Sequence, residues 1–279
     1  RIGTDEVLAT VDADTLAAAD LRGLHLEGAD LRNRDLNHVQ LQYADLMGAD
    51  LSAANLSNAV LIGATLESAN LKGADLSNAR LGNDSHSHAA MMMNANLEGA
   101  NLTRADLRQV ELRESNLEGA DLSRADARRA SFCRANMARL RANDTLFIDA
   151  NMRDVDLQEA DLRYSHLNDA NLSKANLSRV NLESQDESVS TVINLANLEG
   201  ANLSGAKMHN MLAEHVNMRG VDLSDADLSN AVMGGAVLRR AIVTNANFKD
   251  VELATVTMDY ANFSKALNAD VPSYKPNLR

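Results

Sequence analysis

Hydrophobic residues recur at every fifth position along most of this chain. Leucine occupies every fifth residue over 16–81, and hydrophobic residues continue at the same spacing over 92–182 and 193–263. A small residue, usually alanine, stands two positions before most of them, and the other three positions are mostly polar. The spacing therefore divides about residues 16–265 into consecutive pentapeptides.

A five-residue spacing fits neither regular secondary structure. A helix turns by about 500° in five residues, which would scatter the leucines around its axis. A straight strand alternates its faces, so leucines five residues apart would point to opposite sides. The chain must therefore bend after every leucine, and eleven of the fourteen glycines lie two positions after it, where a left-handed turn residue is needed. A chain that bends regularly forms stacked coils, which predicts a β-solenoid.

The pentapeptides also carry a family pattern. ADLSN, ANLEG, ANLSK and ADLSR are instances of A(D/N)LXX, and the chain resembles the pentapeptide-repeat family over about residues 16–265. The resemblance implies an all-β fold, a right-handed quadrilateral parallel β-helix with four pentapeptides per coil and about 12 coils. Residue n then lies against residue n+20. The undersized Ala213 would stack against Met233, with Met211 filling space two positions earlier.

Both ends of such a solenoid need covering, because an open coil exposes unpaired strand edges. We expect residues 1–15 to form an N-terminal cap, with a short helix over 4–16 that begins at Thr4 as its N-cap. Residues 266–279 form the expected C-terminal cap or tail, in which two prolines discourage further pairing. A single elongated repeat domain, 16–265, lies between them. The sequence does not decide whether two copies of the chain form a homodimer through an end cap.

The spacing is interrupted twice, at 82–91 and at 183–192. The 101 residues from Leu81 to Leu182 equal five coils of twenty plus one residue, which predicts that both interruptions leave the same edge of the solenoid. One interpretation is a tolerated bulge copied by an internal duplication, since NANLEGANL and LANLEGANL follow the two sites. The other interpretation is a pair of protruding loops that contact a partner. The candidate contacts are then Asn83, Asp84, His86, His88, Gln185, Asp186 and Glu187.

A small basic patch is the other candidate contact surface. Arg104 and Arg124 are twenty residues apart, as are Arg108 and Arg128. They either grip a carboxylate-rich partner or form an ordinary solvated face, because acidic residues surround them. The His-Ser-His sequence at 86–88 supplies too few ligands for structural zinc, which takes four, so no metal or cofactor is predicted.

Composition and charge narrow the class of partner. The net charge of −12 disfavours binding to nucleic acid phosphates. The excess of acid is uneven: −8 over residues 1–100, zero over 101–182 and −4 over 183–279. No apolar run approaches 18 residues, so we expect no membrane-spanning helix. The lone Cys133 allows no intrachain disulfide and is compatible with a reducing compartment such as the cytoplasm. Since the chain begins with arginine, we expect a processed protein or a part of a longer one.

Two functional hypotheses follow. No nucleophile elbow, phosphate-binding loop or zinc-protease motif is present, so an enzyme is not expected. The first hypothesis is a non-catalytic scaffold that presents flat faces and two loops to another protein. The alternative comes from the family resemblance: some bacterial members are acidic DNA mimics that bind DNA gyrase or topoisomerase and protect it from quinolone-type poisons. The neutral central third of the chain favours the scaffold.

Overall fold

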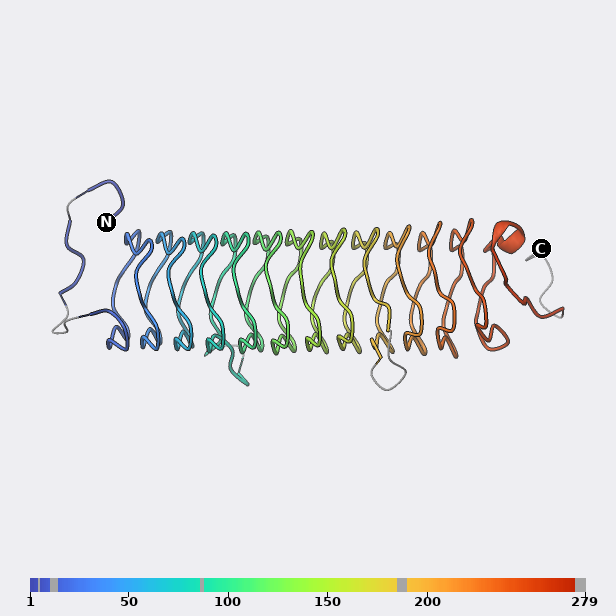
Figure 1. The fold of residues 1–279 in the computed structure, drawn as a ribbon, viewed down its shortest axis with the longest axis horizontal. Coiled ribbons are helices and arrows are strands. Elements are labelled where there is room, and N and C mark those ends of the chain that lie inside the picture. The colour runs from blue at the N-terminus through green and yellow to red at the C-terminus, as the bar shows by residue number, and fades with distance from the viewer. Residues whose placement is uncertain (5, 11–14, 86–87, 185–189, 274–279) are drawn as a thin grey trace. The chain divides into compact units, whose positions relative to one another are not determined.

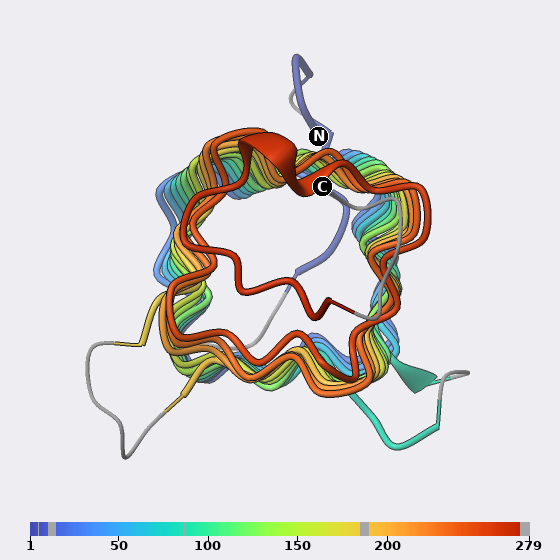
Figure 2. The ribbon, with the colours of Figure 1, turned by 90° about the vertical axis from the view of Figure 1, so that its right-hand side faces the viewer.

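The structure, a computed structural model, describes residues 1–4, 6–10, 15–85, 88–184 and 190–273. These residues form two compact units, Arg1–Arg141 and Ala142–Arg279. Within each unit the chain winds in coils, and isolated parallel bridges join residues twenty positions apart, such as Asp20 with Gln40 and Asn197 with Asn217. Twenty residues are four pentapeptides, and Figure 2 shows four sides in each coil. The predicted four-sided parallel β-helix is therefore present in both units.

Each pentapeptide has the same local structure. Asp45 makes the bridge, and the next residue, Leu46, is fully buried and donates its backbone N–H to the Thr65 carbonyl at 2.7 Å. Two turn residues follow, the second of which is Gly48 with φ 62°. The Ala49 N–H then donates back to the Leu46 carbonyl at 3.0 Å and closes a β-turn. The chain thus bends once in five residues, as the spacing predicts.

The second turn residue adopts the left-handed conformation in most of the described repeats. All eleven glycines predicted for this position have positive φ. The position is not confined to glycine, since Arg104 at φ 59° and Ala53 at φ 54° occupy it as well. A residue other than glycine, asparagine or aspartate costs about 1–2 kcal/mol there. The backbone hydrogen bonds to the neighbouring coil fix the turn and offset that cost.

The core consists of stacked columns of the hydrophobic and small residues, which are almost completely buried. Ala213, Met211 and Met233 are 0%, 0% and 1% exposed. The Ala213 N–H donates to the Val232 carbonyl at 2.8 Å, so the coil that contains Met233 lies directly against Ala213. A large side chain therefore fills the space beside a small one, as the twenty-residue register predicts.

The N-terminal helix is a correction to the sequence analysis. Thr4 Oγ1 accepts a hydrogen bond from the Glu6 N–H at 3.3 Å, as an N-cap residue would, but residues 6–10 are not helical. Residues 11–14 lie outside the described part of the chain. Val7 is 73% exposed, so its side chain adds none of the tertiary packing on which short helices depend.

The C-terminal end is better covered. The 3₁₀ helix η2, Phe263–Lys265, appears in Figure 1 near the end of the coils. Its N-cap, Asn262, accepts from the Ser264 N–H, and the Phe263 ring packs on Phe248 with 5.2 Å between centroids. Leu267 still bridges to Asn247, so the ladder continues just past η2.

Candidate interaction site

The bridges give the true size of the two interruptions. Thr65 pairs with Met91 and His166 pairs with Val192, 26 residues apart instead of 20. Each interruption therefore inserts six residues, whereas the spacing of the leucines indicated an excess of one. The regular spacing between the interruptions, over 92–182, then comprises 19 pentapeptides. The count of five whole coils plus one residue therefore no longer supports a common edge for the two loops, and the common edge stays a prediction.

The first interruption is fastened to the next coil of its own unit. Figure 1 shows it leaving the run of coils. The Asn83 N–H donates to the Arg108 carbonyl at 3.1 Å, and the Arg108 guanidinium contacts the carboxylate of Asp84. Gly82 donates to the Asp106 carbonyl at 2.8 Å. Three predicted contact residues, Asn83, Asp84 and Arg108, are thus brought together, mainly to hold the loop in place.

His88 lies on the return side of this loop. Its ring meets the ring of Tyr43 edge-on, with 6.3 Å between centroids, and its Nδ1 lies 3.4 Å from Ser85 Oγ. The other predicted histidine, His86, falls outside the described residues. In the part of the chain that the structure describes, no three His, Cys, Asp or Glu side chains are grouped so that they could hold a metal ion.

The predicted arginine patch is electrostatically balanced where its contacts are described. Arg108 pairs with Asp106 at 2.8 Å and approaches Asp126 at 3.8 Å, and Arg128 pairs with Asp126 at 2.6 Å. Burial raises the pKa of Asp106, but the hydrogen bonds and charge of Arg108 outweigh it and hold that pKa below 3.8. Arg104 and Arg124 occupy turn positions in neighbouring coils, at φ 59° and 64°.

The second interruption is closed at its base by two buried hydroxyls. Ser184 and Thr191 are both fully buried, and the Thr191 N–H donates to Ser184 Oγ at 2.8 Å. Thr191 Oγ1 in turn accepts from the Tyr164 N–H at 2.7 Å. The predicted contacts Gln185, Asp186 and Glu187 lie outside the described residues.

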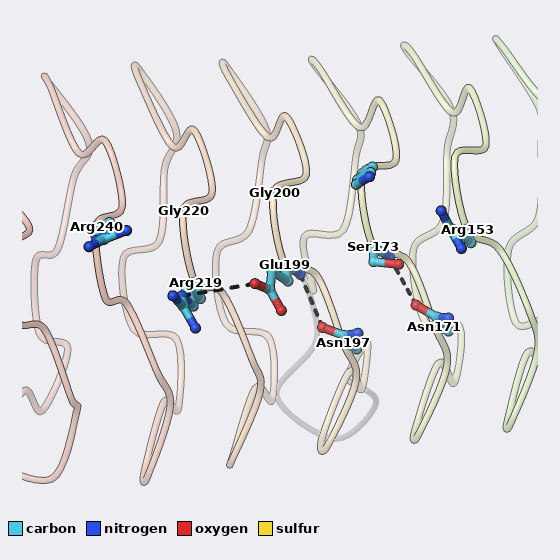
Figure 3. Close-up of a pocket in the computed structure, with 10 residues that line it drawn as sticks. Arg153, Asn171, Ser173, Asn197, Glu199, Gly200, Arg219, Gly220 and Arg240 are labelled. Atoms are coloured by element: carbon cyan, nitrogen blue, oxygen red, sulfur yellow. Dashed lines mark hydrogen bonds and ion pairs between the residues drawn. The ribbon is translucent and has the colours of Figure 1, made fainter.

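An open groove on unit 2 was not predicted from the sequence. It encloses about 560 Å³. Figure 3 shows Arg153 near one end and Arg219 and Arg240 near the other, with Ser173 and Glu199 on the coils between them. The lining residues are Arg153, Asn171, Ser173, Lys174, Asn197, Glu199, Gly200, Arg219, Gly220 and Arg240.

Two glycines in successive coils make the floor of the groove. Gly200 and Gly220 occupy the second turn position at φ 69° and 65°, where Lys174 and Arg240 in the same column carry long side chains. The Lys174 stem lies over Gly200, with Cγ 3.8 Å from where a β-carbon would stand, and no atom lies within 4 Å of the corresponding point at Gly220. The surface is therefore hollow over two coils and bounded in the same column by Lys174 and Arg240.

The groove is basic although the chain is acidic. Four of the ten described lysines and arginines of unit 2 line it; the ten are Arg153, Arg163, Lys174, Arg179, Lys207, Arg219, Arg239, Arg240, Lys249 and Lys265. Glu199 is the one acidic lining residue and lies 3.9 Å from Arg219. Within the described residues, no carboxylate pairs with Lys174 or Arg240, and the Arg240 guanidinium lies 5.9 Å from the centroid of the Tyr260 ring.

The sequence contained a signal for this groove. Lys174, Gly200, Gly220 and Arg240 follow one another in one column when the step across the second interruption is 26 residues and the other steps are 20. A uniform step of twenty from Lys174 misses all three later members. The size of the interruption was thus needed before the column could be recognised.

A family model described as Pentapeptide repeats matches the chain in eight copies that together cover residues 16–83, 90–184 and 196–267. The gaps in this match fall at the two interruptions. The match implies the right-handed, quadrilateral β-helix of that repeat. Within the described residues, no helix has the length and apolar character needed to cross a bilayer.

Several solved structures are similar to the chain. HetL, a pentapeptide repeat protein involved in heterocyst differentiation regulation from the cyanobacterium Nostoc sp. strain PCC 7120, is 30% identical over 81% of this chain and 89% of its own, with a TM-score of 0.37. A pentapeptide repeat protein of the Arabidopsis thaliana thylakoid lumen is 34% identical over 38% and 66%, with a TM-score of 0.28. Full-length QnrB1, a plasmid-mediated fluoroquinolone resistance protein, is 16% identical over 87% and 90%, with a TM-score of 0.29. No curated protein sequence matches the chain.

Proposed function

Because the chain belongs to the pentapeptide repeat family, whose members are generally structural or interaction proteins rather than enzymes, we propose that it is a non-catalytic scaffold for protein–protein interaction. The observation that carries the proposal is the groove of unit 2. There the surface is hollowed over Gly200 and Gly220, and four basic side chains gather around the hollow. A partner recognises a surface by such local departures in shape and charge.

The chemistry of the groove supports binding rather than catalysis. Acid–base chemistry at neutral pH uses groups whose environments move their pKa values apart. The lining residues include one carboxylate, Glu199, and it is half exposed beside Arg219. Three arginines and a lysine offer hydrogen-bond donors to an anion instead.

The alternative function, a DNA mimic that binds gyrase, has no specific observation in its favour. A DNA mimic must present acid where DNA presents phosphate. The groove of unit 2 has the opposite sign, and the first interruption of unit 1 is held by an ion pair between Asp84 and Arg108. We therefore retain the scaffold as the proposed function.

The test is affinity capture with the immobilised chain in an extract of its source, followed by titration of each captured protein in purified form. Saturable binding of at least one purified protein supports the scaffold. If no purified protein binds saturably, the proposal is wrong. A parallel gyrase supercoiling assay, with and without ciprofloxacin, detects the alternative, since a DNA mimic protects or inhibits the enzyme at micromolar concentration.

A further inference from the structure

We propose that the groove of unit 2 binds an extended, acidic segment of a partner protein, with carboxylates at its two ends and a neutral stretch in its middle. This inference rests on the proposed function and names the chemical class of the partner. It starts from the contrast between a chain of net charge −12 and a groove lined by four basic side chains and one acid. A basic groove on an acidic protein selects acidic ligands by local charge complementarity.

The spacing of the basic residues sets the spacing of the carboxylates. Lys174 and Arg240 are three coils apart in one column, with Gly200 and Gly220 between them. Three steps at about 4.8 Å give about 14 Å. An extended peptide advances about 3.3 Å per residue, so side chains four residues apart lie about 13 Å apart and on the same face. Glutamates or aspartates at that spacing would reach Lys174 and Arg240 together.

The ends of the groove each hold a second basic side chain. Arg153 lies beside the Lys174 end and Arg219 beside the Arg240 end, as Figure 3 shows for the labelled arginines. Arg153 already forms an ion pair with Asp154 at 3.0 Å, whereas Lys174 and Arg240 have no acidic partner among the described residues. We therefore assign the main contacts to Lys174 and Arg240, with the two arginines in support.

Glu199 makes the groove selective for a patterned segment. It lies between the two basic ends, as Figure 3 shows. A carboxylate in the middle repels a ligand that carries negative charge at every step, such as a phosphate backbone, but not a segment whose middle is neutral. The net charge of the chain opposes a polyphosphate as well, and the lining includes no aromatic side chain on which a base could stack.

The floor favours an extended main chain. Gly200 and Gly220 expose a single column of turn backbone, and this column follows the direction in which the coils stack. Without β-carbons at these two positions, a peptide backbone approaches the surface closely. Filling the floor should therefore weaken binding even when every charge is kept.

The experiment uses the full chain and a fluorescein-labelled peptide with glutamates about four residues apart and glycine and serine between them. Fluorescence anisotropy measures its affinity against a control peptide with glutamine at the same positions. We expect the double variant K174E/R240E to bind the glutamate peptide at least about tenfold more weakly than the unaltered chain. The matched control, K207E/K249E, changes the net charge equally on other faces and is expected to bind nearly as well.

A second variant tests the floor. Gly220→Asn keeps all charges, and asparagine fits the turn because Asn210 and Asn230 occupy the same turn position at φ 58° and 57°. We expect weaker binding with an unchanged thermal unfolding curve. Unaltered affinity in this variant, together with equal losses in the two charge variants, would mean nonspecific attraction and would overturn the groove as a site.

Two further outcomes separate the proposals. A single-stranded oligonucleotide that carries the same charge and binds as tightly as the peptide would contradict the acidic protein segment. If the captured partner still binds K174E/R240E at full affinity and the glutamate peptide does not bind the unaltered chain, the groove inference fails while the scaffold stands. If no partner is captured, the scaffold itself fails.

Discussion

Gly82 lies against the backbone of Arg108 in the next coil. A β-carbon at position 82 would collide with the Arg108 amide nitrogen and stand 2.9 Å from its carbonyl oxygen. Backbone atoms in a hydrogen-bonded ladder cannot move aside as a side chain can. We expect Gly82→Asn to lower the free energy of unfolding by about 1–3 kcal/mol, the usual cost of overpacking. Chemical denaturation measures the loss.

The matched control places asparagine at a glycine with open space around it. No atom lies within 4 Å of the β-carbon position at Gly99, and its φ of 64° is one that asparagine readily adopts. Gly99→Asn is expected to change stability by less than about 0.5 kcal/mol. If both variants lose the same free energy of unfolding, the close contact with the Arg108 backbone does not destabilise Gly82→Asn.

Met233 supplies volume that Ala213 lacks in the neighbouring coil. Both residues are buried, and Met233→Ala would place two alanines side by side in one column. We expect a loss of about 2–5 kcal/mol from the cavity. Adding Ala213→Met should restore most of it, since the pair then exchanges its volumes and such swaps cost less than about 1.5 kcal/mol. If the second change brings no recovery, the two side chains do not share one space.

The fold was predictable because one physical constraint repeats. A leucine every fifth residue forces a bend after each, and burial of residues such as Leu46 and Ala49 follows directly from that bend. The N-terminal helix was not predictable in the same way. The N-cap signal at Thr4 is real, since its hydroxyl accepts from Glu6, but a local signal alone does not stabilise a short helix.

The site was harder to predict because the leucine spacing does not reveal the full length of an insertion. It shows only how many residues remain after whole pentapeptides are removed. An insertion of six and an insertion of one shift the leucines equally, so the bridge from His166 to Val192 was needed to tell them apart. The groove depends on that register, since it aligns Lys174 with Gly200. Likewise, Arg108 could be predicted as part of a basic patch, but its ion pair with Asp84 arises from the path of the loop.

The base of the second interruption depends on one buried hydroxyl. Ser184→Ala removes the acceptor of the Thr191 N–H in a site that water does not reach. A buried donor without a partner costs about 1–3 kcal/mol, so we expect a loss of stability in that range by chemical denaturation. Ser204→Ala, at a half-exposed serine in the same unit, is the control and should have little effect. A loss as small as that of the control would indicate that the base opens to water.

At low pH, protonation of Asp227 should lower the stability of unit 2. Burial raises the pKa of this carboxyl, but hydrogen bonds from the Ser229 hydroxyl at 2.7 Å, the Ser229 N–H and Asn247 outweigh it, so the pKa lies below 3.8. Because its pKa is lowered in the fold, the ionised carboxylate stabilises the fold above pH 3.8. This contribution is lost as the pH falls through and below that value and the carboxylate is protonated. Asp227→Asn keeps the shape but cannot titrate. Its denaturation midpoint should therefore fall less than that of the unaltered chain between about pH 5 and pH 3, and equal falls would contradict the assignment.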